Sequence, residues 1–377
     1  MTSAAWLFPP ASLGFRNSLS QVGLLVFMVL EGLELNPRLL RDKGHAALVT
    51  SHVSIIAPFM LGAALSLYLY PRLSDDSVSF TGFALFMGAA MSVTAFPVLA
   101  RILSERGLTR TRVGAVTIAC AAVDDVTAWC ILAGVVVLVR SGAEGLPLWV
   151  TVGGSLGFIV AMVWAVRPLL ARMESAFHRR GGITQDMLAL ILLLALASAW
   201  TTEWLGIHAL FGAFVAGAIM PKNEGFVHAL NEKLEDVTVV LLLPLFFAFT
   251  GLRTAFGLVS GAEMWGYTAL IILVAIAGKF GGSTVAARAT GMGWRESGAL
   301  GVLMNTRGLM ELVILNIGLD IGVISPGLFA MMVLMALFTT FMTSPLLEWI
   351  YPTRLIRAAA AETAAPEPPP VPAGAVG

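Results

Sequence analysis

The sequence predicts an all-α polytopic membrane protein, and three observations carry this prediction. Of the 377 residues, 58% are hydrophobic and only 12% are charged, whereas about 25% are charged in a typical soluble domain. The 38 glycines fit this class, because glycine is more frequent in membrane helices than in soluble ones. Apolar runs long enough to cross a bilayer recur along most of the chain.

We place about eleven such runs by length, and together they define a transmembrane domain over residues 19–350. In order, the runs lie near residues 19–35, 46–70, 80–102, 113–139, 148–170, 187–204, 207–220, 237–252, 264–289, 297–317 and 328–350. Outside this domain we expect an extracytoplasmic segment at residues 1–18. At residues 351–377 we expect a disordered cytoplasmic tail, because alanine and proline without aromatic residues cannot form a core.

Lysine and arginine are unevenly shared between alternate connections, which predicts the orientation in the membrane. One set of connections holds only Arg16, Arg72, Arg140 and Arg253. The other set holds seventeen, namely Arg38, Arg41, Lys43, Arg101, Arg106, Arg110, Arg112, Arg167, Arg172, Arg179, Arg180, Lys222, Lys233, Arg288, Arg295, Arg354 and Arg357. The rich set is therefore predicted to be cytoplasmic, with the C-terminus inside, in the inner membrane of a bacterial cell.

Two adjacent aspartates, Asp124 and Asp125, lie inside the fourth apolar run. A carboxylate in hydrocarbon costs at least ~3 kcal/mol, so an intramembrane acid indicates a path for ions or protons and requires a partner. Counting from the predicted cytoplasmic ends at 1.5 Å per residue, Asp124 lies ~18 Å deep, Lys279 ~14 Å and Arg307 ~18 Å. Three helices thus place ionisable groups in one layer near the midplane.

Neighbouring residues on a helix point about 100° apart, so the two aspartates cannot both face one partner. We expect Asp124 or Asp125 to pair with Lys279 and the other to face an aqueous cavity as a cation and proton site. Hard cations such as Na⁺ and K⁺ prefer oxygen ligands, which carboxylate, hydroxyl and carbonyl groups supply. The alternative is that Lys279 and one of the two aspartates form a purely structural ion pair, and that the second aspartate has no function in transport.

Two of the runs contain a break. The third run carries Thr94 next to Pro97, and proline in a helix interior removes a backbone hydrogen bond, which predicts exposed carbonyls beside the Thr94 hydroxyl at the midplane. An ordinary proline kink is the alternative. The tenth run has a polar break at Asn305–Gly308, which hints at an inverted repeat. Arg307 and Glu311 share one helix face, either to brace the bundle as an ion pair or to handle ions.

With these motifs the chain resembles the second monovalent cation:proton antiporter family, which includes glutathione-gated potassium-efflux systems and plant cation/proton exchangers. The resemblance runs from Leu7 to about Ile350. The matching stretches are LLVFMVLEGLELNPRLLR from Leu24, SVTAFPVLARILSERGL from Ser92, AAVDDVTAW from Ala121, LGIHALFGAFVAGAIMP from Leu205, LLPLFFAFTGLRT from Leu242 and NTRGLMELVILNIGLD from Asn305.

The resemblance implies an inverted-repeat fold with a core domain and a dimerisation domain, alternating access by an elevator-like shift, and homodimers. It implies that Asp125 binds the cation while Asp124 forms a salt bridge with Lys279. Two crossed, broken helices would flank the site, at 94–97 and 305–308. Family members have about two further helices before the first run found here, and Glu31 stands where relatives have a small or apolar residue.

The sequence therefore predicts a secondary transporter, not an enzyme, that exchanges Na⁺ or K⁺ for H⁺ across the membrane. No cofactor and no nucleic-acid partner are expected; the formal net charge is zero. Two alternatives stay open: a gated cation channel or non-transporting sensor on the same scaffold, and an intramembrane aspartyl protease. The protease would need two carboxylates that face each other and share a proton.

Overall fold

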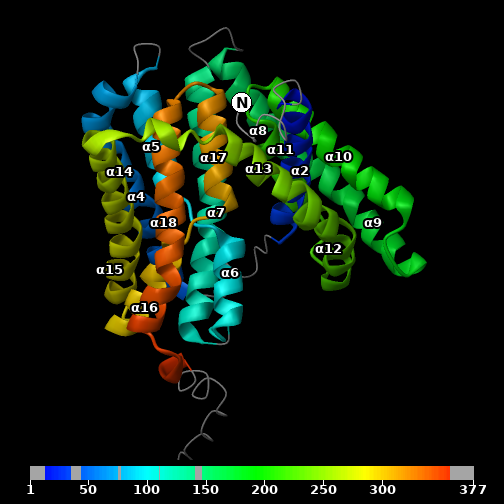
Figure 1. The fold of residues 1–377 in the computed structure, drawn as a ribbon. Helices are drawn as coiled ribbons and strands as arrows, with labels where there is room; N and C mark the ends of the chain where they lie inside the picture. The colour runs from blue at the N-terminus through cyan, green and yellow to red at the C-terminus, as the bar shows by residue number, and fades with distance from the viewer. Residues whose placement is uncertain (1–12, 35–43, 75–77, 110, 141–146, 357–377) are drawn as a thin grey trace, which may run out of the picture.

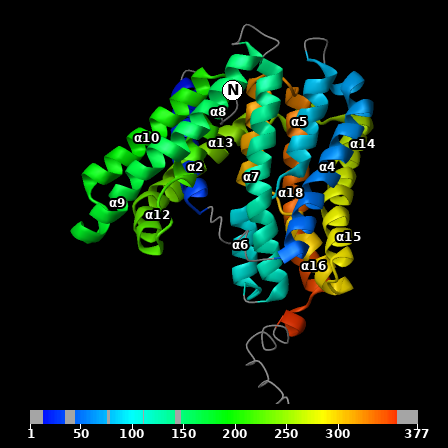
Figure 2. The ribbon, with the colours of Figure 1, turned by 180° about the vertical axis from the view of Figure 1, so that it is seen from behind.

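The computed structural model describes residues 13–34, 44–74, 78–109, 111–140 and 147–356, and all secondary structure in these ranges is helical. The helices form two groups that pack mainly within themselves (Figures 1 and 2). The core group consists of α4 (Gly44–Leu73), α5 (Phe80–Ser92), α6 (Phe96–Glu105), α7 (Arg112–Arg140), α14 (Gly261–Ile276), η5 (Ala277–Gly281), α15 (Gly282–Ala289), α16 (Trp294–Met304), α17 (Leu309–Asp320) and α18 (Pro326–Ile350).

The scaffold group lies beside the core group and includes the most exposed helices of the molecule. It consists of α2 (Leu13–Glu34), α8 (Leu148–Ala161), η2 (Met162–Val166), α9 (Arg167–Arg180), α10 (Gln185–Trp204), α11 (Ala209–Ala218), α12 (Glu224–Val237), η3 (Thr238–Leu242) and α13 (Leu243–Arg253). A 3₁₀ turn, η4 (Phe256–Leu258), lies on the connection from α13 of this group to α14 of the core group. One apolar cluster, with buried residues of α2 and α17 among its members, fills the interface between the groups.

Within the described residues, eight helical segments are long and apolar enough to span a membrane, and the bent pair α16–α17 makes a ninth. The remaining predicted runs, 19–35 and 207–220, correspond to α2 and to α11, which has only 10 residues. The predicted all-α membrane fold is confirmed, but the count of eleven crossings is not. Some spans are longer than predicted, for example Trp149–Arg180 and Glu224–Leu258, because hydropathy marks the apolar part of a helix and not its polar ends.

Glycine allows the closest contact within the scaffold group, between α2 and α11. A Cβ atom on Gly32 would lie 2.2 Å from the carbonyl oxygen of Phe214, and one on Gly217 would lie 2.1 Å from that of Val29. Neither position has room for any side chain, so the two backbones touch directly, as small residues permit in membrane helices. This contact fixes the position of α2, the scaffold helix that carries Glu31.

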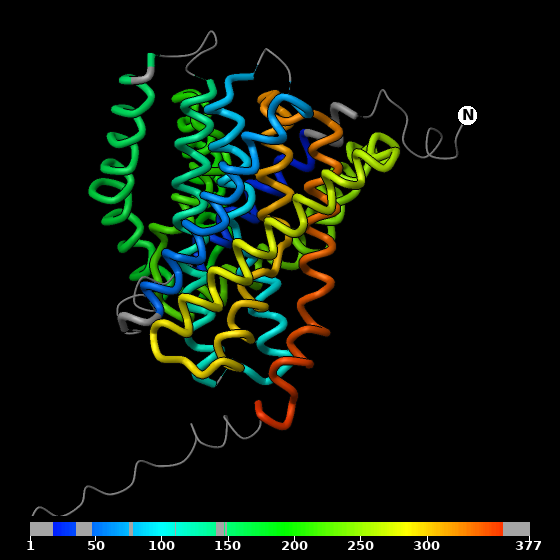
Figure 3. Tube along the Cα trace, turned by 90° about the vertical axis from the view of Figure 1, so that its left-hand side faces the viewer, coloured from blue at the N-terminus to red at the C-terminus, as the bar shows by residue number. Residues whose placement is uncertain are grey.

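Three helices contain a turn of π-helix, namely η2, η3 and η5. Such turns are often found at functional sites, and η5 contains Lys279. Figure 3 shows the long rod α14–η5–α15 crossing the bundle obliquely. Of the predicted terminal segments, residues 1–12 and 357–377 lie outside the described residues, while 13–18 form the start of α2.

Candidate functional site

Two broken helices cross in the centre of the core group. The first break, between α5 and α6, spans Val93–Ala95, with extended backbone at both ends and Pro97 in the first turn of α6. The second break, between α16 and α17, bends the chain by 44°. The two breaks are joined directly, since the backbone N–H of Ala95 donates to the carbonyl oxygen of Thr306 at 3.1 Å. The predicted interruptions therefore lie side by side, although about 210 residues separate them in the sequence.

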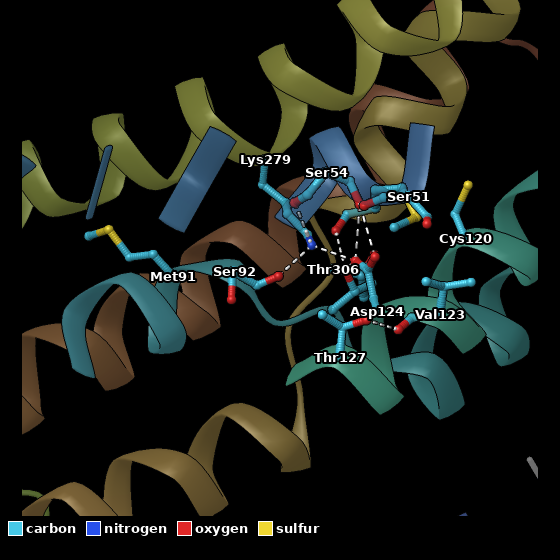
Figure 4. A network of polar contacts seen from close by, with 12 residues as sticks. Ser51, Ser54, Met91, Ser92, Cys120, Val123, Asp124, Thr127, Lys279 and Thr306 are labelled. Atoms are coloured by element: carbon cyan, nitrogen blue, oxygen red, sulfur yellow. Dashed lines mark hydrogen bonds and ion pairs between the residues drawn. The ribbon is translucent and has the colours of Figure 1, made fainter. Parts of the chain in front are cut away.

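Asp124 is fully buried on α7 and saturated with hydrogen-bond donors. Its Oδ2 lies 2.6 Å from Lys279 Nζ and accepts from Thr94 Oγ1 at 2.9 Å, while Ser54 Oγ of α4 donates to Oδ1 at 2.9 Å (Figure 4). The Thr94 hydroxyl is also 3.1 Å from the carbonyl oxygen of Met304. Asp124 thus connects α4, η5 and both breaks into one polar cluster.

Lys279 Nζ has three acceptors and is fully buried. Besides Asp124, it donates to the carbonyl oxygens of Ser92 at 2.6 Å and of Ser54 at 3.0 Å. The π-turn that carries it packs tightly on α4, where a Cβ atom on Gly278 would lie 2.7 Å from Pro58 Cα. Each of the three N–H bonds of an ammonium group has an acceptor here, so the hydrogen bonds of Lys279 fit its charged form.

Asp125 points to different surroundings. Its side chain is only 6% exposed, and its Oδ1 is buried without a hydrogen bond to any described residue. The buried carboxyl group of Glu31 on α2 lies within electrostatic range of Asp125. Among the described residues, Asp125 therefore has no cationic partner at hydrogen-bond distance.

Arg307 and Glu311 form a second buried ion pair, with 2.8 Å between Nη1 and Oε2. Arg307 also donates to the carbonyl oxygens of Ala90 at 2.8 Å and Met91 at 2.6 Å. Together with Lys279 on Ser92, two cations thus bind the last three carbonyl groups of α5. A helix ends in negative partial charge, so these cations stabilise a half-helix that stops inside the membrane.

Sequence reasoning missed two residues of this cluster. Ser54, which holds Asp124, was not singled out, although the polar stretch 50–54 inside an apolar run was a usable signal. The sequence marks Glu31 only as a departure from the residues of its relatives, and in the structure it is 7% exposed, within electrostatic range of Asp125. Their positions depend on how α2 and α4 are rotated, which the sequence does not specify.

The comparisons with known proteins agree with this geometry. Residues 12–349 match the family described as "Sodium/hydrogen exchanger, transmembrane". The Na(+)/H(+) antiporter NhaS4 of Synechocystis sp. is 46% identical over 346 residues, which cover 92% of this chain and 84% of that protein. Cation/H(+) antiporter 17 of Arabidopsis thaliana is 42% identical, and K(+)/H(+) antiporter 1 of Saccharomyces cerevisiae is 34% identical. The chain spans only 42% and 40% of these two longer proteins.

Among solved structures, the sodium proton antiporter MjNhaP1 of Methanocaldococcus jannaschii has a similar fold. Its TM-score is 0.63 at 16% sequence identity, with 93% of this chain and 87% of that chain covered. The resemblance to cation:proton antiporters is therefore confirmed, and so is the predicted all-α antiporter fold with its broken helices. This chain belongs to the sodium/hydrogen exchanger family of transmembrane proteins.

Proposed function

We propose that the protein is a secondary antiporter that exchanges Na⁺ or K⁺ for H⁺, and that Asp125 binds the transported ion. One observation carries this proposal: the buried carboxyl oxygen of Asp125 without a hydrogen bond to any described residue, next to an Asp124 that is fully paired. The family and the names of the antiporters at 46%, 42% and 34% identity support the same activity.

The charges around Asp125 explain why the binding of one ion is coupled to the release of the other. Lys279 neutralises Asp124, so Asp125 and Glu31 remain as acids in a low-dielectric region, where uncompensated charge is costly. A bound proton or a bound alkali cation neutralises the carboxylate and offsets this cost. Once one of them is bound, the other gains no such stabilisation by binding. Competition for one carboxylate therefore couples the two fluxes. Thr94 supports the site through Asp124, because its hydroxyl group donates to Asp124 Oδ2 at 2.9 Å and lies 3.1 Å from the carbonyl oxygen of Met304.

The two helix groups provide the moving parts of this mechanism. The cluster around Asp124 belongs entirely to the core group, whereas Glu31 belongs to the scaffold group. A shift of the core group along the scaffold group would carry Asp125 from one side of the membrane to the other. In this proposal the C-terminus is cytoplasmic, lipid surrounds the exposed apolar residues of α8 and α10, and two copies associate through their scaffold groups.

The alternatives differ in their demands on the site. A protease dyad needs two carboxylates that share a proton, but Asp124 is bound to Lys279, so the two adjacent aspartates do not form one. A channel would pass cations only down their gradient. Cation accumulation against its gradient, driven by an imposed pH difference in proteoliposomes, separates an antiporter from a channel or a sensor.

The direct test is Asp125→Asn in proteoliposomes that contain the purified full chain and a fluorescent pH indicator. We expect cation-dependent proton movement to be abolished, because an amide cannot alternate between protonated and cation-bound states. Asp236→Asn, which removes an exposed carboxylate on α12, is the matched control and should retain activity. Unchanged exchange in Asp125→Asn would rule out the assignment.

A further inference from the structure

We propose that Arg140, Glu203, Arg253 and Asp320 form an ion-pair gate that closes one end of the interface between the core and scaffold groups. The gate lies at the end of the bundle where α7 and α17 terminate, which we call the α7/α17 end (the upper end in Figure 1). The proposal rests on the proposed function, since only a protein with alternating access needs this contact to open and close in each cycle.

The first pair joins α7 of the core group to α10 of the scaffold group. Arg140 is the last residue of α7, and its Nη1 lies 3.1 Å from Glu203 Oε1. The other oxygen of Glu203 accepts from the backbone N–H of Ala209 at 2.9 Å, at the start of α11. A helix N-terminus stabilises a carboxylate, so Glu203 is held on the scaffold group and aimed at the core group.

The second pair joins α13 of the scaffold group to α17 of the core group. Arg253 and Asp320 are the last residues of these helices, with 2.6 Å between Nη2 and Oδ1. Arg253 Nη1 also donates to Asn316 Oδ1 at 3.1 Å, and Asn316 returns a hydrogen bond to Thr250 Oγ1 at 3.0 Å. This second contact therefore crosses the interface with one ion pair and two hydrogen bonds.

His208 lies between the two pairs. It precedes α11, and its charged neighbours are Glu203, Arg140 and Asp320. The Nδ1 atom of His208 accepts a hydrogen bond from the backbone N–H of Leu210 at 3.4 Å, in the first turn of α11. His208 also lines a cavity of about 30 Å³ together with Ser20, Arg253, Asn316 and Asp320.

The opposite end of the bundle, where α6 and α18 terminate, lacks such contacts. Among the described residues, each ion pair away from the gate stays within one group, as Arg106 with Glu348 does in the core group and Arg180 with Asp186 in the scaffold group. The groups are thus linked by charge at the α7/α17 end alone, as far as the described chain extends. All four gate residues are 23–46% exposed. Such pairs are individually weak, as a contact that breaks in every cycle needs to be.

The test measures access to Ser20, a residue of α2 that is 2% exposed and lies under the second pair. Ser20→Cys is introduced into the full chain after Cys120 and Cys130 are replaced by alanine. The protein is placed in lipid nanodiscs and treated with a small water-soluble thiol reagent. We expect Glu203→Gln with Asp320→Asn to speed labelling at least fivefold, because neutralising both acids releases the core group from the scaffold group at this end.

Charge reversal provides the second readout. Asp320→Arg alone should also speed labelling, through repulsion from Arg253, and Arg253→Asp with Asp320→Arg should slow it again. Glu348→Gln, which breaks a pair inside the core group, is the matched control and should leave the rate unchanged. Equal labelling in all variants would overturn the proposal, and so would equally fast labelling in the control. Because no transport is measured, a failure of the Asp125 test would not affect this result.

Discussion

At the residue scale, the site depends on how charge is divided between two adjacent acids. Asp124 has a lysine and two hydroxyl donors, whereas Asp125 Oδ1 has no described donor. Depth along the helices predicts that Asp124, Lys279 and Arg307 share a layer. It could not predict that Lys279 would bind Asp124 or that Arg307 would bind the end of α5, because these choices depend on helix rotation and packing.

The Asp124–Lys279 pair gives a stability prediction. Asp124→Asn or Lys279→Met alone leaves an uncompensated buried charge, and we expect each to cost about 3–5 kcal/mol in unfolding free energy. The double variant Asp124→Asn with Lys279→Met should lose less than the sum of the two, because both charges are gone. Thermal unfolding of the purified protein in detergent measures these differences.

The control for this prediction is Glu105→Gln, which breaks the exposed pair between Arg101 and Glu105. Its unfolding temperature should stay close to that of the wild type, since water already solvates both charges. Strictly additive losses at Asp124 and Lys279 would contradict a direct interaction between them.

At the scale of helices, cationic side chains bind the carbonyl groups at the buried ends of helices. Arg307 and Lys279 bind the end of α5, and Lys222 binds the end of α2, where its Nζ lies 2.8 Å from the carbonyl oxygens of both Gly32 and Leu33. The sequence shows where the breaks are, through Pro97 and the 305–308 stretch. It does not show which cation reaches which end, because these partners are up to 217 residues apart.

Lys222 gives a pH prediction. Burial, with a smaller effect from Arg167, lowers the pKa of Lys222 from 10.5 to about 7. Below pH 7 the lysine is protonated in both folded and unfolded protein, while between pH 7 and 10.5 mainly the unfolded protein holds the proton. The contribution of Lys222 to the free energy of unfolding therefore rises with pH between pH 7 and pH 10.5.

We expect the unfolding temperature of the wild type to rise relative to that of Lys222→Met between pH 7 and pH 9.5, on the order of 2 °C. Differential scanning fluorimetry of both proteins across this range measures the slope. Lys233→Met, which removes an exposed lysine on α12, should keep the wild-type slope. A Lys222→Met curve parallel to the wild type would show that Lys222 does not titrate there.

At the scale of the whole molecule, the distribution of basic residues predicts the orientation. The set of connections with seventeen lysines and arginines includes those at the end where α6 and α18 terminate, and the poor set includes the gate residues Arg140 and Arg253. Cytoplasmic connections carry the excess of positive charge. We therefore predict that the ion-pair gate faces outward and closes the outer side of the protein.

A reporter fusion tests this orientation. Alkaline phosphatase folds into an active enzyme only outside the cytoplasm, so it should be inactive when fused after Gly377 and active when fused after Arg140. A fluorescent protein fused after Gly377 should fluoresce, since it matures in the cytoplasm. The reverse pattern would place the gate on the cytoplasmic side.

The sequence alone determined the class of the protein, the two breaks and the three charged residues Asp124, Lys279 and Arg307 of the central layer. Hydropathy and the high cost of charge in hydrocarbon make these features visible without a structure, because each depends on one segment and its surrounding lipid. The resemblance implied that Asp124 pairs with Lys279, as the structure shows. Only the tertiary structure decided that Ser54 donates to Asp124, that Glu31 is buried within electrostatic range of Asp125, and that Arg140 and Arg253 have partners in the other helix group. These are contacts between segments far apart in the chain, and they depend on how the helices rotate and pack.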